Sequence, residues 1–141
     1  LMDPRCLDDV VAPLIADGQL GISTLAFRII DPEEYDNPKD VKVVVDYRGD
    51  ALYFSRAPLP FARDDGEAFD SFKHLGVYAY RRRFLEIFRE LPTGRLESIE
   101  KLEQLRALEY GHCVHVVVTP YDSPEVDLPS DIPRIEKLMA G

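Results

Sequence analysis

Five short runs rich in β-branched and aromatic residues alternate along this chain with longer amphipathic segments. The second and third runs are joined by residues 48–50, a short connection with Gly49 in the middle that is typical of a β-hairpin. Strands that alternate with helices favour an α/β fold, and a hairpin requires antiparallel neighbours, so the sequence predicts a mixed sheet. The predicted strands are 23–30, 41–47, 51–56, 75–80 and 114–119.

Apolar residues at helical spacing predict the remaining elements. The strongest pattern covers 96–110, and Gly111 follows it as a C-cap. Ile99, Leu102 and Leu105 are expected to form its apolar stripe. The three arginines at 81–83 are expected on a solvated face. Further helices are predicted at 5–17, 81–91 and 130–139, with loops at 31–38, 62–72 and 120–129.

Composition excludes several classes of function. The 141 residues suit one domain with its own core, and 45% of them are hydrophobic. With 17 Lys and Arg against 26 Asp and Glu, the formal charge of −9 disfavours binding to nucleic acid. No apolar run has the length of a membrane span, so we expect no membrane partner. Cys6 and Cys113 lack metal-ligand spacing and fit reduced thiols in the cytoplasm.

The strand predicted at 75–80 has one face of unusual composition. Because side chains alternate along a strand, His74, Gly76, Tyr78 and Tyr80 share a face, and the opposite face is wholly apolar. A glycine inside a strand often marks the close approach of a ligand or of another backbone. The His and Tyr side chains then form a hydrogen-bonding wall; the alternative is an ordinary solvent-facing strand.

Four further residues are candidates for a binding site. Arg56 follows a strand, where ligands of α/β sheets bind, and its guanidinium suits a carboxylate or a phosphate. Glu103 and Gln104 interrupt the apolar stripe of 96–110, and such a pair can bind sugar hydroxyls. The alternative is a solvated face with Glu103 paired to Arg106. Asp127 precedes the last helix, where it can cap the helix or bind Mg²⁺.

Together the motifs resemble one family, the 3-deoxy-manno-octulosonate (Kdo) cytidylyltransferases, or CMP-Kdo synthetases. The resemblance extends over nearly the whole chain, and its most specific motifs are ALYFSRAP, HLGVYAY and LEQLR. The matching blocks are Asn37-Pro38, VKVV (41–44), ALYFSRAPLPF (51–61), HLGVYAYRRRFL (74–85), LESIEKLEQLRALEYG (96–111) and VDLPSDI (126–132).

The resemblance implies a mixed-sheet, nucleotide-diphospho-sugar transferase-like fold. It also implies that the family's N-terminal, nucleotide-binding half is missing from these residues, since the match starts partway through the family pattern at Leu1-Met2. Residues 1–141 would then be the C-terminal, sugar-binding and dimerising part of one cytidylyltransferase domain, and would be inactive alone.

The same resemblance assigns roles to individual residues. Arg56, His74 and Tyr78 would bind Kdo, and Glu103 with Gln104 would hydrogen-bond its hydroxyls. Asp127 would be the catalytic residue that binds Mg²⁺.

The family reaction transfers CMP from CTP to Kdo and releases pyrophosphate, for lipopolysaccharide biosynthesis. The implied cofactor is Mg²⁺, the substrates are CTP and Kdo, and the implied assembly is a homodimer with the hairpin 41–56 near its interface. The alternative is a sugar-acid-binding or dimerisation module without catalysis.

Overall fold

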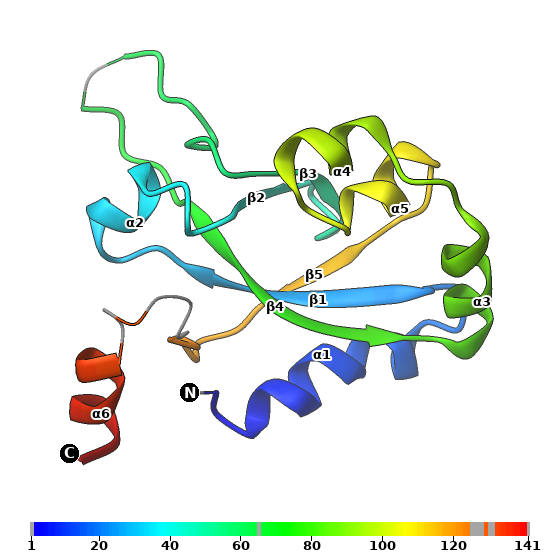
Figure 1. The fold of residues 1–141 in the computed structure, drawn as a ribbon, viewed down its shortest axis with the longest axis horizontal. Helices are drawn as coiled ribbons and strands as arrows, with labels where there is room; N and C mark the ends of the chain where they lie inside the picture. Colours follow the sequence, from blue (N-terminus) through cyan, green and yellow to red (C-terminus); the bar gives the residue numbers. More distant parts are fainter. Residues whose placement is uncertain (1, 65, 125–128, 130–131, 141) are drawn as a thin grey trace.

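The computed structural model describes residues 2–64, 66–124, 129 and 132–140. A five-stranded sheet with the order β3-β2-β4-β1-β5 forms its centre (Figure 1). Strand β5 runs parallel to β1, whereas the other neighbouring strands pair antiparallel. All five predicted strands and the mixed α/β sheet are therefore confirmed. The strands are β1 (Ile22–Arg28), β2 (Lys42–Val45), β3 (Ala51–Ser55), β4 (Phe72–Tyr80) and β5 (His115–Val118).

Helices cover both faces of the sheet (Figure 1). On one face, Cys6 and Val10 of α1 pack against Leu25 and Leu75. The opposite face carries the larger core, to which α3, α5 and Leu102, in the turn between α4 and α5, contribute. No helix of the described residues is long and apolar enough to cross a membrane. The helices are α1 (Arg5–Ala16), α2 (Pro32–Asp36), α3 (Arg82–Glu90), α4 (Arg95–Glu100), α5 (Leu105–Glu109) and α6 (Ile132–Ala140).

The prediction of a single helix over 96–110 is wrong, because the segment forms two short helices, α4 and α5. Lys101 ends α4 in the left-handed conformation with φ 57°, and the N–H of Leu102 donates to the carbonyl of Glu97 at 3.3 Å. This left-handed turn at Lys101 buries Leu102, whereas Ile99 of the predicted apolar stripe is 65% exposed. Burial of Leu102 in the core outweighs the continuity of the helix.

A short helix, α2, replaces part of the loop predicted at 31–38. Asp31 caps it by accepting a hydrogen bond from the N–H of Glu33, and Pro32 occupies the first turn. Both residues are common at helix starts. The helix has only five residues, too few for a periodic apolar pattern.

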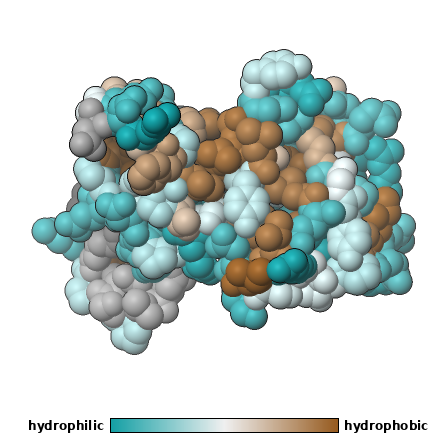
Figure 2. Space-filling model, turned by 90° about the horizontal axis from the view of Figure 1, so that it is seen from above, coloured by the Kyte–Doolittle hydropathy of each residue, from teal (hydrophilic) through white to brown (hydrophobic). Residues whose placement is uncertain are grey.

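The predicted hairpin is present, and its turn reaches across to β5. The N–H of Ala51 donates to the carbonyl of Val114 at 2.8 Å, and the N–H of Val116 donates to that of Gly49 at 2.8 Å. The sheet is therefore strongly curled, and the end of β3 lies beside α4. Tyr47 and Leu52 of the hairpin remain 93% and 63% exposed. Seen from above, the molecule shows apolar side chains gathered in the middle of a more hydrophilic surface (Figure 2).

One of the three arginines expected on a solvated face is a structural anchor instead. The guanidinium of Arg81 donates to the carbonyls of Leu14, Asp17 and Leu20, at and just beyond the C-terminal end of α1. A cation at this end of a helix satisfies carbonyls that lack helical partners. Arg82 is solvated as predicted, with its side chain 93% exposed.

Replacing Arg81 should destabilise the fold through these lost contacts. We expect Arg81→Ala to lower the free energy of unfolding by about 1–3 kcal/mol, because partly buried carbonyls lose a charged donor. Arg82→Ala is the matched control and should change it by less than about 0.5 kcal/mol. Urea titration followed by circular dichroism measures both, and equal effects would contradict the anchoring role.

Candidate functional site

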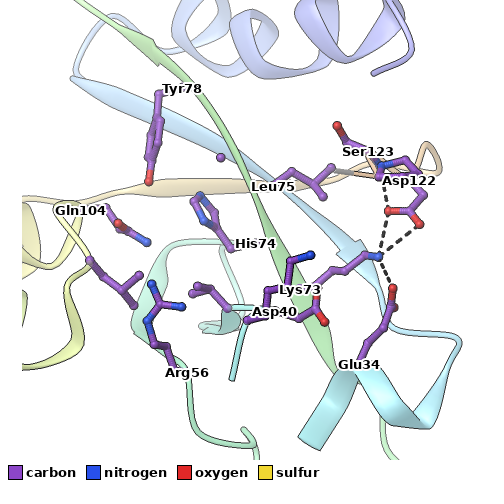
Figure 3. Close-up of a pocket in the computed structure, with 15 residues that line it drawn as sticks. Glu34, Asp40, Arg56, Lys73, His74, Leu75, Tyr78, Gln104, Asp122 and Ser123 are labelled. Atoms are coloured by element: carbon purple, nitrogen blue, oxygen red, sulfur yellow. Dashed lines mark hydrogen bonds and ion pairs between the residues drawn. The ribbon is translucent and has the colours of Figure 1, made fainter. Parts of the chain in front are cut away.

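A cavity of about 450 Å³ lies between the end of β3, strand β4 and the turn that joins α4 to α5. Arg56, His74, Tyr78 and Gln104 all line it. Figure 3 shows these four side chains on one side of the cavity, with Lys73 and its acidic partners on the other. Residues from distant parts of the chain thus meet in one concave site, as the sequence predicts.

One predicted site residue, Glu103, does not join this group. Glu103 is exposed and does not line the cavity, so the expectation that it shares one cleft with the other four is wrong. The left-handed turn at Lys101 changes the helical phase, and it is Gln104, only 5% exposed, that faces inward. The expected pairing of Glu103 with Arg106 is also wrong, because Arg106 binds Glu97 at 2.5 Å. Asp127 lies outside the described residues.

Arg56 is held by backbone carbonyls and forms no ion pair with any carboxylate in the described part of the chain. Its Nε donates to the carbonyl of Glu100 at 3.0 Å, and its Nη1 donates to that of Pro38 at 3.0 Å. Two neutral acceptors orient the guanidinium without cancelling its charge. The cavity wall therefore carries a fixed positive charge suited to an anion.

Glu100 supports this arrangement, and sequence reasoning missed it. Its carboxylate accepts hydrogen bonds from the Ser55 hydroxyl at 2.6 Å and from the N–H of Arg56 at 3.0 Å. Burial alone would raise the pKa of Glu100, but these hydrogen bonds outweigh it and hold the pKa below its ordinary value. The only sequence signal was its place in the series of glutamates at 97, 100 and 103, which does not reveal which one faces β3.

His74 and Tyr78 form part of a row of aromatic rings along one face of β4. The His74 ring lies 5.1 Å from that of Phe54 and 5.3 Å from that of Tyr78, and Tyr78 lies 5.8 Å from Tyr80. The prediction that His74, Tyr78 and Tyr80 share one face is confirmed. Leu75 packs in the core on the opposite side of the sheet, as expected for the apolar face.

The protein environment keeps both of these polar rings neutral. Burial lowers the pKa of His74 to about 4, because a charged imidazolium would lose its hydration. Burial, helped by the nearby Tyr80 and Glu103, raises the pKa of Tyr78 well above its ordinary value. Near neutral pH the site therefore offers an uncharged imidazole and a protonated phenol beside the one guanidinium.

Lys73, the residue before His74, links three segments on the other side of the cavity. Its Nζ binds Glu34 of α2 at 2.6 Å and Asp122 of the segment after β5 at 3.0 Å (Figure 3). Burial tends to lower the pKa of Lys73, but the two carboxylates outweigh it and raise the pKa. Because the three residues lie far apart in the sequence, no spacing pattern could have revealed this cluster.

Within the described residues, no group of three or more His, Cys, Asp and Glu side chains is arranged to hold a metal ion. The expected Mg²⁺ site depends on Asp127, which these residues do not include. The magnesium expectation therefore stays a prediction.

Comparison with known proteins identifies the family. A family model described as "Cytidylyltransferase" matches residues 1–119. The chain belongs to the cytidylyltransferase family. The resemblance carried by the sequence motifs is thereby confirmed.

Among its relatives in this family, a 3-deoxy-manno-octulosonate cytidylyltransferase of Desulfosudis oleivorans is 63% identical over 141 residues. An 8-amino-3,8-dideoxy-manno-octulosonate cytidylyltransferase of Shewanella piezotolerans is 49% identical over 99% of the chain. The chain spans 57% of the length of each of these two relatives.

A solved cytidylyltransferase has the same fold. The structure of a CMP:2-keto-3-deoxy-manno-octonic acid synthetase complexed with CTP superposes with a TM-score of 0.89 and 38% sequence identity. The match covers 97% of this chain and 56% of that one. The expected transferase-like fold is thereby confirmed.

The neutral state of His74 predicts a pH dependence of stability. Its pKa is about 4 in the folded chain and about 6.5 when unfolded, so the unfolded chain binds more protons between these values. Stability should therefore fall as pH drops from 6.5 to 4, by up to about 3 kcal/mol from this residue. His74→Asn should lose this part of the dependence. Unfolding by urea at a series of pH values measures it, and parallel profiles for the two proteins would contradict the assignment.

Proposed function

We propose that this chain is the sugar-acid-binding and dimerisation part of an enzyme that transfers CMP from CTP to Kdo, giving CMP-Kdo and pyrophosphate. The observation that carries the proposal is the Arg56 guanidinium, which lines the cavity and has no carboxylate partner among the described residues. The names of the relatives support the same reaction, and those with 54–63% identity are named for Kdo itself.

The composition of the cavity fits an acidic sugar. Its volume of about 450 Å³ lies within the usual range for small-molecule sites, roughly 300–1,000 Å³. Arg56 would bind the carboxylate through a charge-assisted hydrogen bond. The neutral groups of His74, Tyr78 and Gln104 would bind hydroxyls without adding charge. On the side of the cavity where these four residues lie, one cation among neutral polar groups matches a substrate with one carboxylate and several hydroxyls. The charged Lys73, Glu34 and Asp122 pair with one another on the other side.

In the proposed reaction the anomeric hydroxyl of Kdo attacks the α-phosphorus of CTP, and pyrophosphate leaves. The residues of this cavity would contribute by binding and orienting the nucleophile, which lowers the entropic part of the barrier. The proposal includes Mg²⁺, which would neutralise triphosphate charge, with Asp127 as a candidate ligand. It also includes a cytoplasmic homodimer, for which the exposed Tyr47 and Leu52 of the hairpin offer apolar contact surface.

A chimera tests the proposed reaction directly. The part of the Desulfosudis oleivorans relative outside the match, which the resemblance identifies as nucleotide-binding, would be joined to residues 1–141. The proposal predicts Mg²⁺-dependent pyrophosphate release from CTP plus Kdo by the chimera, and none by residues 1–141 alone. Parallel assays with 8-amino-3,8-dideoxy-manno-octulosonate distinguish the two sugar acids named among the relatives. A folded chimera that binds Kdo without turnover would favour the alternative, a binding module.

Arg56 should control the affinity for the sugar acid. In the active chimera we expect Arg56→Met to raise KM for Kdo about 10- to 100-fold, because a charged hydrogen bond is lost, and to leave KM for CTP nearly unchanged. Glu103→Ala is the comparator, and it should have a smaller effect because that side chain is exposed and does not line the cavity. Initial rates at varied Kdo measure both. An unchanged KM for Kdo in Arg56→Met would show that the guanidinium does not bind this substrate.

A further inference from the structure

The pairing between β1 and β4 contains an irregularity next to the cavity. Thr24 pairs with Tyr78, whereas the next residue, Leu25, pairs with Leu75. Two residues of β4, Gly76 and Val77, therefore have no partner on β1. Because the shift is by two residues, side chains before and after it keep their faces, and His74 stays on the same side as Tyr78.

The side chain of Thr24 fills this irregularity. Thr24 is completely buried, and its hydroxyl oxygen lies 2.7 Å from the carbonyl oxygen of Val77 and 2.8 Å from Nε2 of His74. The carbonyl oxygen of Leu75 lies farther away, at 3.4 Å. One hydroxyl thus contacts both the distorted backbone of β4 and the imidazole that lines the cavity.

The chemistry of these contacts determines where the imidazole proton lies. A carbonyl oxygen can only accept, so the hydroxyl donates its single proton to Val77. The Thr24 oxygen is then an acceptor toward His74, and Nε2 must carry the ring proton. The reverse arrangement would leave two oxygen lone pairs facing each other at 2.7 Å.

We propose that Thr24 is a positioning residue that holds His74 in the Nε2–H tautomer and so presents Nδ1 to the cavity as a hydrogen-bond acceptor. No hydrogen bond to Nδ1 is formed within the described part of the chain, and no buried side-chain nitrogen there lacks a partner. Nδ1 is therefore open to the cavity that His74 lines. The low pKa of His74 keeps this nitrogen unprotonated at neutral pH.

The acceptor at Nδ1 determines which kind of ligand group can form a hydrogen bond there. This step rests on the proposed function. An acceptor at Nδ1 selects a ligand group that donates a hydrogen bond, such as a sugar hydroxyl, and disfavours a carboxylate or phosphate oxygen at this position. Arg56 would donate hydrogen bonds to the carboxylate of the ligand, and His74 would accept one from a hydroxyl of the same ligand. Thr24 would orient the ligand without touching it.

The tautomer can be measured without any activity. In ¹⁵N-labelled protein at pH 7, long-range ¹H–¹⁵N spectra should show His74 with a protonated Nε2 and an unprotonated Nδ1. Thr24→Val, which keeps the side-chain shape and removes the hydroxyl, should raise the Nδ1–H population severalfold, because a buried Nε2–H would lack an acceptor. Thr24→Ser should restore the wild-type spectrum. A protonated Nδ1 in the wild-type protein would overturn the proposal whether or not the variants fold.

Kinetics then test whether the tautomer matters for binding. In the chimera, Thr24→Val should raise KM for Kdo about tenfold with a much smaller change in KM for CTP, and Thr24→Ser should restore it. An unchanged KM for Kdo in a folded Thr24→Val chimera would overturn the positioning role. A chimera that turns over neither sugar acid would refute the proposed function alone, since the spectra of His74 test the tautomer independently.

Discussion

The hydrogen bonds between Glu100 and the end of β3 hold the cavity together. The Glu100 carboxylate accepts from Ser55 and from the main chain of Arg56, and the Arg56 side chain donates back to the Glu100 carbonyl. This reciprocal contact joins α4 to the curled hairpin and fixes the guanidinium. Because the charge of Glu100 is satisfied by neutral donors, the charge of Arg56 stays available. A direct ion pair between the two side chains would have stabilised the same contact but cancelled the positive charge of the cavity wall.

Lys73 and Arg56 of the cavity lining have different partners. Lys73 lies between two carboxylates, whereas Arg56 is oriented by backbone carbonyls. The attraction for an anion is therefore concentrated on the side of Arg56, His74 and Tyr78, where the neighbouring rings are neutral. Lys73 instead ties α2 and the segment after β5 to β4, and so helps to maintain the shape of the opposite wall.

Strand periodicity and the family motifs predict most of the side chains that line the cavity. Alternation along β4 placed His74 and Tyr78 on one face, and the family motifs placed Arg56 and Gln104 beside them. Glu103 was assigned wrongly to the same cleft, because the left-handed turn at Lys101 changes the phase of the helix. A lysine carries no signal for that conformation, which the burial of Leu102 imposes through tertiary packing.

Contacts between distant segments were likewise invisible in the sequence. The bonds of Arg81 to the end of α1 and those of Lys73 to α2 depend on topology rather than on spacing. The Thr24 hydroxyl contacts the His74 ring beside a two-residue shift in the pairing of β1 with β4, although Thr24 itself pairs with Tyr78. Such residues shape the site without belonging to a recognisable motif.

Binding of a sugar acid in the cavity around Arg56 can be observed in residues 1–141 themselves. The ¹⁵N-labelled protein would be titrated with Kdo and followed by NMR. We expect saturable shifts of the Arg56 Nε–H, the His74 ring and the Gln104 side-chain amide, and their loss in Arg56→Met. Saturable shifts confined to other surfaces, such as the arginines at 81–83, would contradict it.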